Sequence, residues 1–432
     1  MDTLTFKRTD NTFKILNATN GGPWYKRGDK YRSNYEDYKA ARIPYSRNHD
    51  SAGCMIYGGP YSHDITCIFP DFSKDADDPD SYDFACTDES ILLTLDAGTQ
   101  TFFRLGQTIE HQVKKHGTLP PPDFHKWAEI CEHIIRHYNE GWADGFKLNI
   151  EYWEIWNEPD IPDDSPNKLT WGGTKAQFFD LYSITAKHLK KRFPELKIGG
   201  PALSDNKEWA DDFLKEMKKR DVPIDFFSWH IYCTEPVQMT EMAKRIKKLL
   251  IDNGYGDAES ILNEYNYIKG WTDQIIYSIK SMIGIKGAAF TMSCITESQK
   301  TDCIDMLMYY DTRPSAFCGA FDFYTCERRK GYYALAWYGK FYDMKRELRC
   351  ENEPERIYTL CGEDDSGKIL CVVTNYCDDD NAPSKAIKLD FGKQGEYEIY
   401  LVDDKHDGEL VKTDKDLVFD MKNQSIILIK EI

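Results

Sequence analysis

Two glutamates in this chain follow apolar runs that have the composition of buried β-strands. Glu158 ends the run EYWEIWNEPD at residues 151–160, and Glu264 lies within ILNEYN at 261–266. The proline at position 159 cannot extend a strand ladder, so the chain must turn there and leave Asn157 and Glu158 at the carboxyl end of the strand. Two carboxylates at strand ends are the groups that retaining glycoside hydrolysis requires: Glu158 to protonate the leaving oxygen and Glu264 to attack the anomeric carbon.

The elements around these glutamates alternate between short apolar runs and amphipathic stretches, a pattern typical of βα units. We expect eight strands, at residues 14–19, 41–47, 99–106, 152–158, 196–202, 225–232, 260–265 and 304–311. Glu158 would then end the fourth strand and Glu264 the seventh, at the end of an eight-stranded barrel where catalytic residues lie. The expected fold class is α/β, with a catalytic (β/α)8 TIM barrel over residues 12–345.

A second, smaller domain is expected over residues 346–432. Runs such as RIYTLCG, KILCVVTNY and SIILIKEI alternate in polarity and are broken by Gly, Asp and Asn, which indicates an antiparallel β-sandwich. Residues 1–11 could add a strand to it. Within the barrel, the acidic loop at 50–83 and the segment at 159–174 follow strands on the catalytic face, so we expect them to wall off the substrate pocket.

Composition narrows the possible partners and the compartment. The net charge of −17 argues against nucleic acid, anionic membranes and polyanionic substrates, and aromatic residues at 14% supply faces on which sugar rings stack. The amino terminus has no apolar leader region, and thirteen cysteines are scattered without a CxxC pair. We therefore expect a reduced, cytoplasmic protein, with a leader trimmed from the sequence as the alternative.

Several motifs together resemble one family of known enzymes. They are RNH at 47–49, WEIWNEPD at 153–160, IGGPA at 198–202, SWHIY at 228–232 and ILNEYN at 261–266. WNEP is shared by several families of the clan A glycoside hydrolases, whereas its combination with SWHIY and RNH is most similar to glycoside hydrolase family 39, which includes β-xylosidases.

The resemblance implies roles for the residues near the two glutamates. Asn157 would bind the sugar 2-hydroxyl, His49 a ring hydroxyl, and His230 and Tyr232 would line the pocket. Arg47 would keep Glu264 ionised, because a nearby cation lowers the pKa of a carboxylate. The alternatives are a buried salt bridge for Arg47 and satisfied core histidines for His49 and His230.

The eighth strand departs from the family pattern. Family xylosidases carry a tryptophan-containing segment and acidic residues here, where this chain reads YYDTRP at 309–314. Tyr310 could replace the aromatic platform and Asp311 could bind a hydroxyl. The departure leaves the identity of the sugar open.

Neither a metal nor a cofactor is expected. His125, Glu129, His133 and His137 recur at helical spacing, but we interpret them as the solvated face of an amphipathic helix. The aspartates at 71–83 do not have the spacing of an EF-hand, so an exposed acidic loop is the expectation.

The sequence thus predicts a retaining exo-glycoside hydrolase that acts on terminal neutral sugars of oligosaccharides, with β-xylosidase as the first choice. An α-L-arabinofuranosidase or another clan A glycosidase is the alternative activity. A non-catalytic carbohydrate-binding protein on the same barrel is the alternative of another class, because fold alone does not determine function. The presence of both glutamates favours the enzyme.

Overall fold

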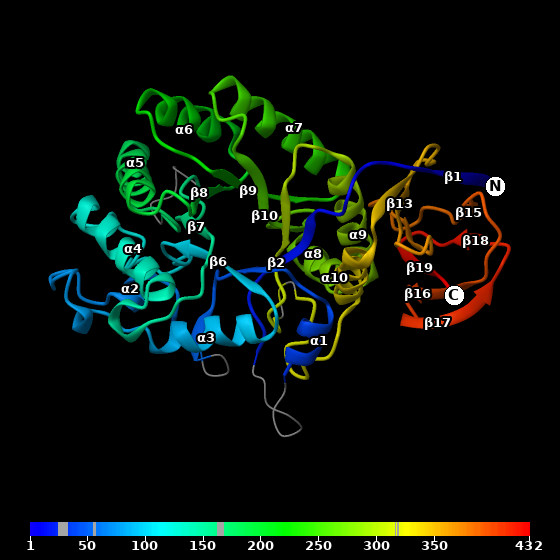
Figure 1. The fold of residues 1–432 in the computed structure, drawn as a ribbon, viewed down its shortest axis with the longest axis horizontal. Helices are drawn as coiled ribbons and strands as arrows, with labels where there is room; N and C mark the ends of the chain where they lie inside the picture. Colours follow the sequence, from blue (N-terminus) through cyan, green and yellow to red (C-terminus); the bar gives the residue numbers. More distant parts are fainter. Residues whose placement is uncertain (25–32, 55–57, 162–167, 316, 318) are drawn as a thin grey trace.

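Eight parallel strands close into a barrel in the computed structural model, which describes residues 1–24, 33–54, 58–161, 168–315, 317 and 319–432 (Figure 1). The strands are β2 (Ile15–Asn20), β3 (Tyr45–Arg47), β6 (Gln100–Leu105), β7 (Tyr152–Ile155), β8 (Lys197–Leu203), β9 (Phe226–Cys233), β10 (Glu259–Tyr267) and β11 (Met306–Tyr309). They run in the order β10-β11-β2-β3-β6-β7-β8-β9. The expected (β/α)8 fold is confirmed, and each strand overlaps one of the eight predicted runs.

Helices surround the barrel on its outer side (Figure 1). The α-helices are α1 (Tyr35–Ala40), α2 (Ile65–Ile68), α3 (Ala85–Asp96), α4 (Phe124–Asn139), α5 (Lys175–Arg192), α6 (Lys207–Lys219), α7 (Pro236–Asp252), α8 (Ile275–Met282), α9 (Ile285–Lys300) and α10 (Lys330–Gly339). Short 3-10 turns lie at Pro79–Ser81, Trp142–Asp144 and Lys340–Asp343. Local sequence fixes the ends of α5, because Thr174 and Gln177 form a reciprocal capping box and three basic residues occupy the last turn.

The barrel interior is built in layers along the strand direction. An apolar layer comes from Ala18, Phe102, Tyr152, Phe226, Ile261, Met306 and Met308. Since side chains alternate across a strand, the residues two positions further on point to the same interior. Those residues include Asn20, Arg104 and Glu154, all fully buried. A polar layer therefore lies directly above the apolar one, toward the carboxyl ends of the strands.

Strands β4 (Ala52–Cys54) and β5 (Gly58–Tyr61) pair with each other in a small separate sheet. Nine further strands form a sheet beside the barrel, on the side of α9 (Figure 1). They are β1 (Asp2–Arg8), β12 (Arg346–Cys350), β13 (Ile357–Glu363), β14 (Ile369–Asn375), β15 (Lys385–Asp390), β16 (Tyr397–Val402), β17 (Asp407–Asp414), β18 (Val418–Met421) and β19 (Ser425–Glu431). Strand β1 joins its two parts, pairing antiparallel with β12 through Phe6–Arg8 and parallel with β15 through Asp2–Thr5. The sheet is thus not wholly antiparallel, because the pairing of β1 with β15 is parallel.

Two of the helical histidines differ from expectation. His133 and His137 on α4 are 4% and 2% exposed, so the prediction of a solvated face is wrong for them. The ring of His137 stacks on Phe84 at 3.6 Å, and the ring of His133 lies 4.5 Å from that of Trp142. Phe84, from the segment before α3, and Trp142, from the turn directly after α4, pack over this face of the helix and bury it. The aspartates at 71–83 are exposed, as expected.

Candidate active site

Glu158 lies just past the end of β7, on a tightly turned piece of backbone. Trp156 and Glu158 have positive φ angles of 76° and 46°. Neighbouring strand ends hold this conformation, because the Trp156 N–H donates to the Leu105 carbonyl at 2.7 Å and the Glu158 N–H donates to the Ala202 carbonyl at 2.9 Å. Non-glycine residues in the left-handed region store strain that a functional site often requires. The turn predicted at the WNEP sequence is therefore present and braced from both sides.

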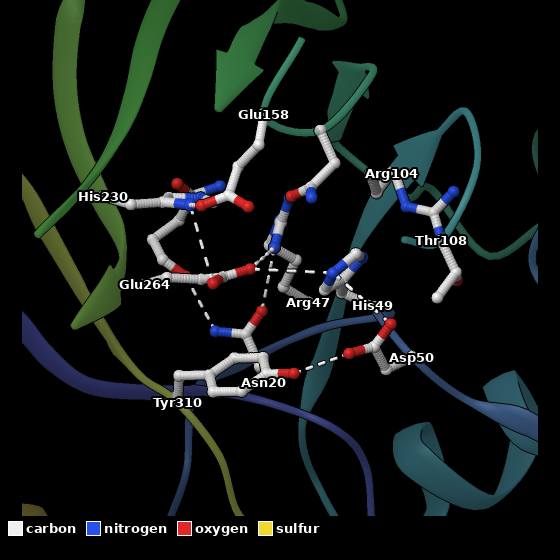
Figure 2. A network of polar contacts seen from close by, with 12 residues as sticks. Asn20, Arg47, His49, Asp50, Arg104, Thr108, Glu158, His230, Glu264 and Tyr310 are labelled. Carbon is white, nitrogen blue, oxygen red and sulfur yellow. Dashed lines mark hydrogen bonds and ion pairs between the residues drawn. The ribbon is translucent and has the colours of Figure 1, made fainter. Parts of the chain in front are cut away.

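The structure brings Glu158 and Glu264 together at the mouth of the barrel (Figure 2). One carboxylate oxygen of each and a ring nitrogen of His230 lie within 4.8 Å of one another. His230 Nδ1 is 2.7 Å from Glu158 Oε1 and 3.5 Å from Glu264 Oε2. The Tyr232 hydroxyl donates to Glu264 Oε2 at 3.0 Å. His230 and Tyr232 therefore line the same small space as the two carboxylates.

Arg47, at the end of β3, is the centre of the buried polar network. Its Nη1 donates to Glu264 Oε1 at 2.8 Å, its Nε to Glu154 Oε2 at 2.6 Å and its Nη2 to Asn157 Oδ1 at 2.6 Å. Arg47 Nη1 also donates to Asn20 Oδ1 at 3.0 Å. The guanidinium thus fixes Glu264 and Asn157 in one geometry while Glu154 balances its charge.

Burial dominates the ionisation of Glu158 and Glu264. It raises the pKa of Glu158 to about 8 and that of Glu264 to about 7. Arg47 lowers the pKa of both carboxyls, as expected for Glu264, but it does not outweigh burial. Because Glu264 has the lower pKa, it ionises first and leaves the proton on Glu158. Burial lowers the pKa of His230 to about 4, so the imidazole beside them is neutral near pH 7.

His49 and Tyr310 form the other side of the site (Figure 2). His49 Nε2 lies 3.8 Å from Glu264 Oε1 and 3.5 Å from Asp50 Oδ1. The Tyr310 hydroxyl donates to Asp50 Oδ2 at 2.5 Å. The Asp311 carboxylate, by contrast, is fully buried and accepts from Arg313 Nε at 2.5 Å. Asp50 therefore stands where a hydroxyl-binding acid was expected, and Asp311 holds Arg313.

Several buried polar atoms around the carboxylates have no hydrogen-bond partner among the residues that the structure describes. They are Asn157 Nδ2, His230 Nε2, His49 Nδ1 and Asp50 Oδ1. Buried polar groups are rarely left unpaired in folded proteins, so a set of them in one place points to a polar ligand. Donors and an acceptor on opposite sides of two carboxylates suit a molecule rich in hydroxyl groups.

Sequence reasoning missed four members of this network: Asn20, Asp50, Glu154 and Asn263. Asn263 Nδ2 donates to Glu154 Oε1 at 2.5 Å, which completes the second layer behind Arg47. The available signal was the two-residue period of the strands. Asn20 and Glu154 each lie two positions beyond a residue of the apolar layer, which places them in the interior just below the site.

A cation site is conceivable between the two glutamates. Glu158, His230 and Glu264 each offer one ligand atom there. A divalent ion there would lie beside the Arg47 guanidinium, which is 2.8 Å from Glu264 Oε1. Repulsion between the two cations weighs against such a site.

Comparisons with known proteins agree with this geometry. Residues 55–252, which include Glu158 and His230, match the family model of glycosyl hydrolases family 39. The segment is thus similar in sequence to that family. The resemblance predicted from the short motifs is thereby confirmed.

Two curated relatives are β-xylosidases. The β-xylosidase of Geobacillus stearothermophilus is 28% identical over 172 residues, which is 35% of this chain and 33% of the relative. The β-xylosidase of Caldicellulosiruptor saccharolyticus is 30% identical over 196 residues, 39% of this chain and 38% of the relative. These matches thus span about a third of each relative's length.

Solved structures resemble the whole chain. A glucosidase from Croceicoccus marinus has a TM-score of 0.79 at 20% identity, covering 100% of this chain and 99% of that one. A monomeric β-xylosidase from Caulobacter crescentus CB15 has a TM-score of 0.69 at 15% identity, with the same coverage. At these identities the likeness establishes that a barrel with an accessory sheet is a shared fold.

Proposed function

We propose that this chain is a retaining exo-glycoside hydrolase, a β-xylosidase, with Glu264 as nucleophile and Glu158 as acid/base. The observation that carries the proposal is the close approach of the two buried carboxylates, whose oxygens lie within 4.8 Å of each other. Retaining enzymes place their carboxyl groups about 5–5.5 Å apart, whereas inverting enzymes need about 6.5–9.5 Å to admit a water molecule. The family 39 segment and the β-xylosidase relatives support the same class.

The first step breaks the glycosidic bond. A Glu264 oxygen forms a bond to the anomeric carbon as the bond to the leaving oxygen breaks, and the Glu158 proton passes to that oxygen. Arg47 and Tyr232, both donating to Glu264, hold the attacking carboxylate in place. Asn157, oriented by Arg47, has its free Nδ2 donors available for the 2-hydroxyl, whose hydrogen bond strengthens as positive charge develops at the anomeric carbon.

The second step releases the sugar. Glu158, now ionised, takes a proton from a water molecule while the water oxygen bonds to the anomeric carbon and the bond to Glu264 breaks. Glu264 leaves as a carboxylate, and Glu158 regains the proton with which the cycle began. Two displacements at one carbon give net retention of configuration.

Enclosure of the site supports exo action. Glu158 and Glu264 are 6% and 4% exposed, so little of the catalytic pair faces open solvent. The loop after β3 is tied to the end of β6, because Asp64 accepts from Arg104 Nη2 at 2.8 Å and from the Thr108 N–H at 2.9 Å. In the segment at 159–174, residues 162–167 lie outside the described residues, and the contribution of that segment stays a prediction.

We propose the identity of the sugar from the β-xylosidase relatives and from the charge of the pocket. Asp50, Glu154 and Glu264 face Arg47 and His49, so the site has no surplus of positive charge for a uronate. A panel of nitrophenyl glycosides tests the assignment. We expect β-D-xyloside to be hydrolysed fastest, ahead of α-L-arabinofuranoside and β-D-glucoside. Preference for the arabinofuranoside would favour the alternative activity, and binding without hydrolysis of any member would favour a carbohydrate-binding protein.

We also propose a reducing, cytoplasmic location. Cys131, Cys294 and Cys371 are buried thiols that form no disulfide, and burial raises the pKa of each well above its usual value. Thiol titration of the unfolded protein without reductant should find nearly all thirteen cysteines reactive. Several protected cysteines would argue for an oxidising compartment. Among the described residues, no helix has the length and apolar character needed to cross a membrane.

A further inference from the structure

An exposed tryptophan stands beside the residues that hold the nucleophile. Trp271 lies in the loop between β10 and α8 and is 56% exposed, unusual for so large an apolar side chain. Its ring is 5.0 Å from the ring of Tyr232, at an angle of 74°. Because the Tyr232 hydroxyl donates to Glu264 at 3.0 Å, one aromatic side chain separates Trp271 from the nucleophile.

Neighbouring elements fix Trp271 in spite of its exposure. Its ring is nearly parallel to that of Phe317, at 6.2 Å and 21°, and Phe317 packs against the barrel core. The loop itself is anchored at its start, where the Ile268 N–H donates to the Cys233 carbonyl at 3.1 Å and the Lys269 N–H donates to Ser278 Oγ at 3.0 Å. An apolar face that is both exposed and held in place is suited to binding a flat partner with little loss of side-chain entropy.

The position of Trp271 decides which part of a substrate it can meet. The sugar that is attacked must lie among Glu158, Glu264 and His230, each 6% exposed or less, so its ring is enclosed. An exposed face outside that enclosure can contact only the next unit, on the leaving-group side of the bond.

Resting on the proposed exo-glycosidase function, we propose that Trp271, backed by Phe317, is the stacking platform for the leaving-group sugar. The apolar face of a pyranose ring would lie on the indole, as sugars pack on aromatic faces. Trp271 would thereby select substrates by their leaving group, whereas the glycone is selected deeper in the site.

The test compares substrates with and without a ring in the leaving group. A glycosyl fluoride loses a single atom and cannot reach the platform, whereas the corresponding disaccharide can. For Trp271→Ala we expect kcat/KM on the disaccharide to fall about tenfold or more and kcat/KM on the fluoride to change less than twofold. Trp271→Phe should recover part of the loss. Ile251→Ala is the matched control, since Ile251 is 58% exposed near the end of α7, on the opposite face of the barrel.

A second readout uses the covalent intermediate. With a sugar acceptor added, the wild-type intermediate should partition between water and acceptor, and Trp271→Ala should lower the transfer fraction. Equal losses on fluoride and disaccharide, or an unchanged transfer fraction, would overturn the platform while leaving the glycosidase assignment intact. A wild-type protein that hydrolyses no glycosyl fluoride at all would instead overturn the proposed function, and the platform with it.

Discussion

At the residue scale, the site depends on one cation placed among several acids. Arg47 is fully buried and donates to Glu154, Glu264 and Asn157, so removing it would leave two buried carboxylates without their partner. The pKa values of Glu158 and Glu264 are consequently governed by two opposed effects: burial, which favours the neutral forms, and Arg47, which favours the ionised ones. Burial prevails, and it does so more strongly at Glu158.

This balance predicts a narrow bell-shaped pH profile for kcat/KM. Activity needs Glu264 ionised and Glu158 protonated. Since their pKa values are raised to about 7 and about 8, activity should rise as the pH passes about 7 and fall as it passes about 8. Rates measured across buffers at constant ionic strength check this. A plateau extending down to pH 5 would show that Glu264 ionises far more readily than its burial implies.

Two aspartates allow the limbs of that profile to be assigned separately. The charge of Asp50 raises the pKa of both glutamates, so Asp50→Asn should move both limbs to lower pH. The charge of Asp205 raises the pKa of Glu158, so Asp205→Asn should shift the basic limb and leave the acid limb in place. The shift for Asp205 should be the smaller one, because this residue is exposed and solvent screens its charge. A shift of the acid limb alone in Asp205→Asn would reverse the assignment.

At the element scale, the strands were predictable because their apolar runs have the right length and spacing. The bounds of the strands were less predictable. Strand β3 was expected over 41–47 but begins at Tyr45, because Arg42 has a left-handed φ of 55° and belongs to a turn after α1. Glu158 was identifiable because it follows such a run, and Glu264 because it comes shortly after Ile261 and Leu262, although β10 continues to Tyr267. Glu154 lies within a run of aromatic residues, and only the barrel shows that its side chain points inward.

The misassigned face of α4 has a similar cause. Helical spacing shows which residues share a face, but Phe84 and Trp142, which cover that face, come from other segments of the chain. The sequence likewise could not determine the role of Asp311. Its partner Arg313 is two residues away, and either residue could have faced the pocket.

Close packing of the barrel strands gives a stability prediction at this scale. A Cβ at Gly199 on β8 would lie 2.2 Å from the backbone oxygen of Phe226 on β9. Backbone atoms of two adjacent barrel strands cannot move apart without breaking the ladder, so Gly199→Ala should lower the free energy of unfolding by about 1–3 kcal/mol or more. Denaturant titration measures this loss of free energy.

Gly256→Ala is the control for that change. The nearest atom to a Cβ at Gly256 is a side-chain carbon of Ile251 at 3.5 Å, which is an ordinary contact. We expect the denaturant midpoint of Gly256→Ala to stay at the wild-type value. Equal destabilisation by both changes would mean that the close approach of β8 and β9 is not what makes Gly199 necessary.

At the scale of the whole molecule, the accessory sheet supports the face that carries the site. Asp378, in the connection after β14, accepts from the Tyr267 hydroxyl at 2.5 Å and from Lys269 Nζ at 2.9 Å. It also pairs with Lys286 at 2.7 Å. Tyr267 ends β10, the strand that carries Glu264, and Lys269 lies two residues before Trp271. The second domain thus stabilises the loop that carries Trp271, the residue that we propose binds the leaving-group sugar.

Loss of that brace should be visible in stability and in substrate choice. Asp378→Ala removes one of the two carboxylates that pair with Lys286, whose side chain is 5% exposed, and leaves Asp380 at 2.9 Å as the other. We expect a loss of about 1–3 kcal/mol in the free energy of unfolding and a weaker preference for disaccharide over glycosyl fluoride. Lys415→Ala, at an ion pair of 3.8 Å between exposed side chains, should change neither quantity. Unaltered stability in Asp378→Ala would show that the two domains do not depend on this contact.

The central claim is the division of labour between Glu264 and Glu158, and chemical rescue tests it most directly. Both alanine variants should lose activity, with the acid/base contribution alone worth about 10²–10⁴-fold. In Glu264→Ala, azide should restore turnover of an activated glycoside and give a glycosyl azide of inverted configuration, because one displacement replaces two. In Glu158→Ala, azide should give the retained glycosyl azide. The anomeric configuration, read by proton NMR, contradicts the account if the two products are exchanged or if wild-type hydrolysis proceeds with inversion.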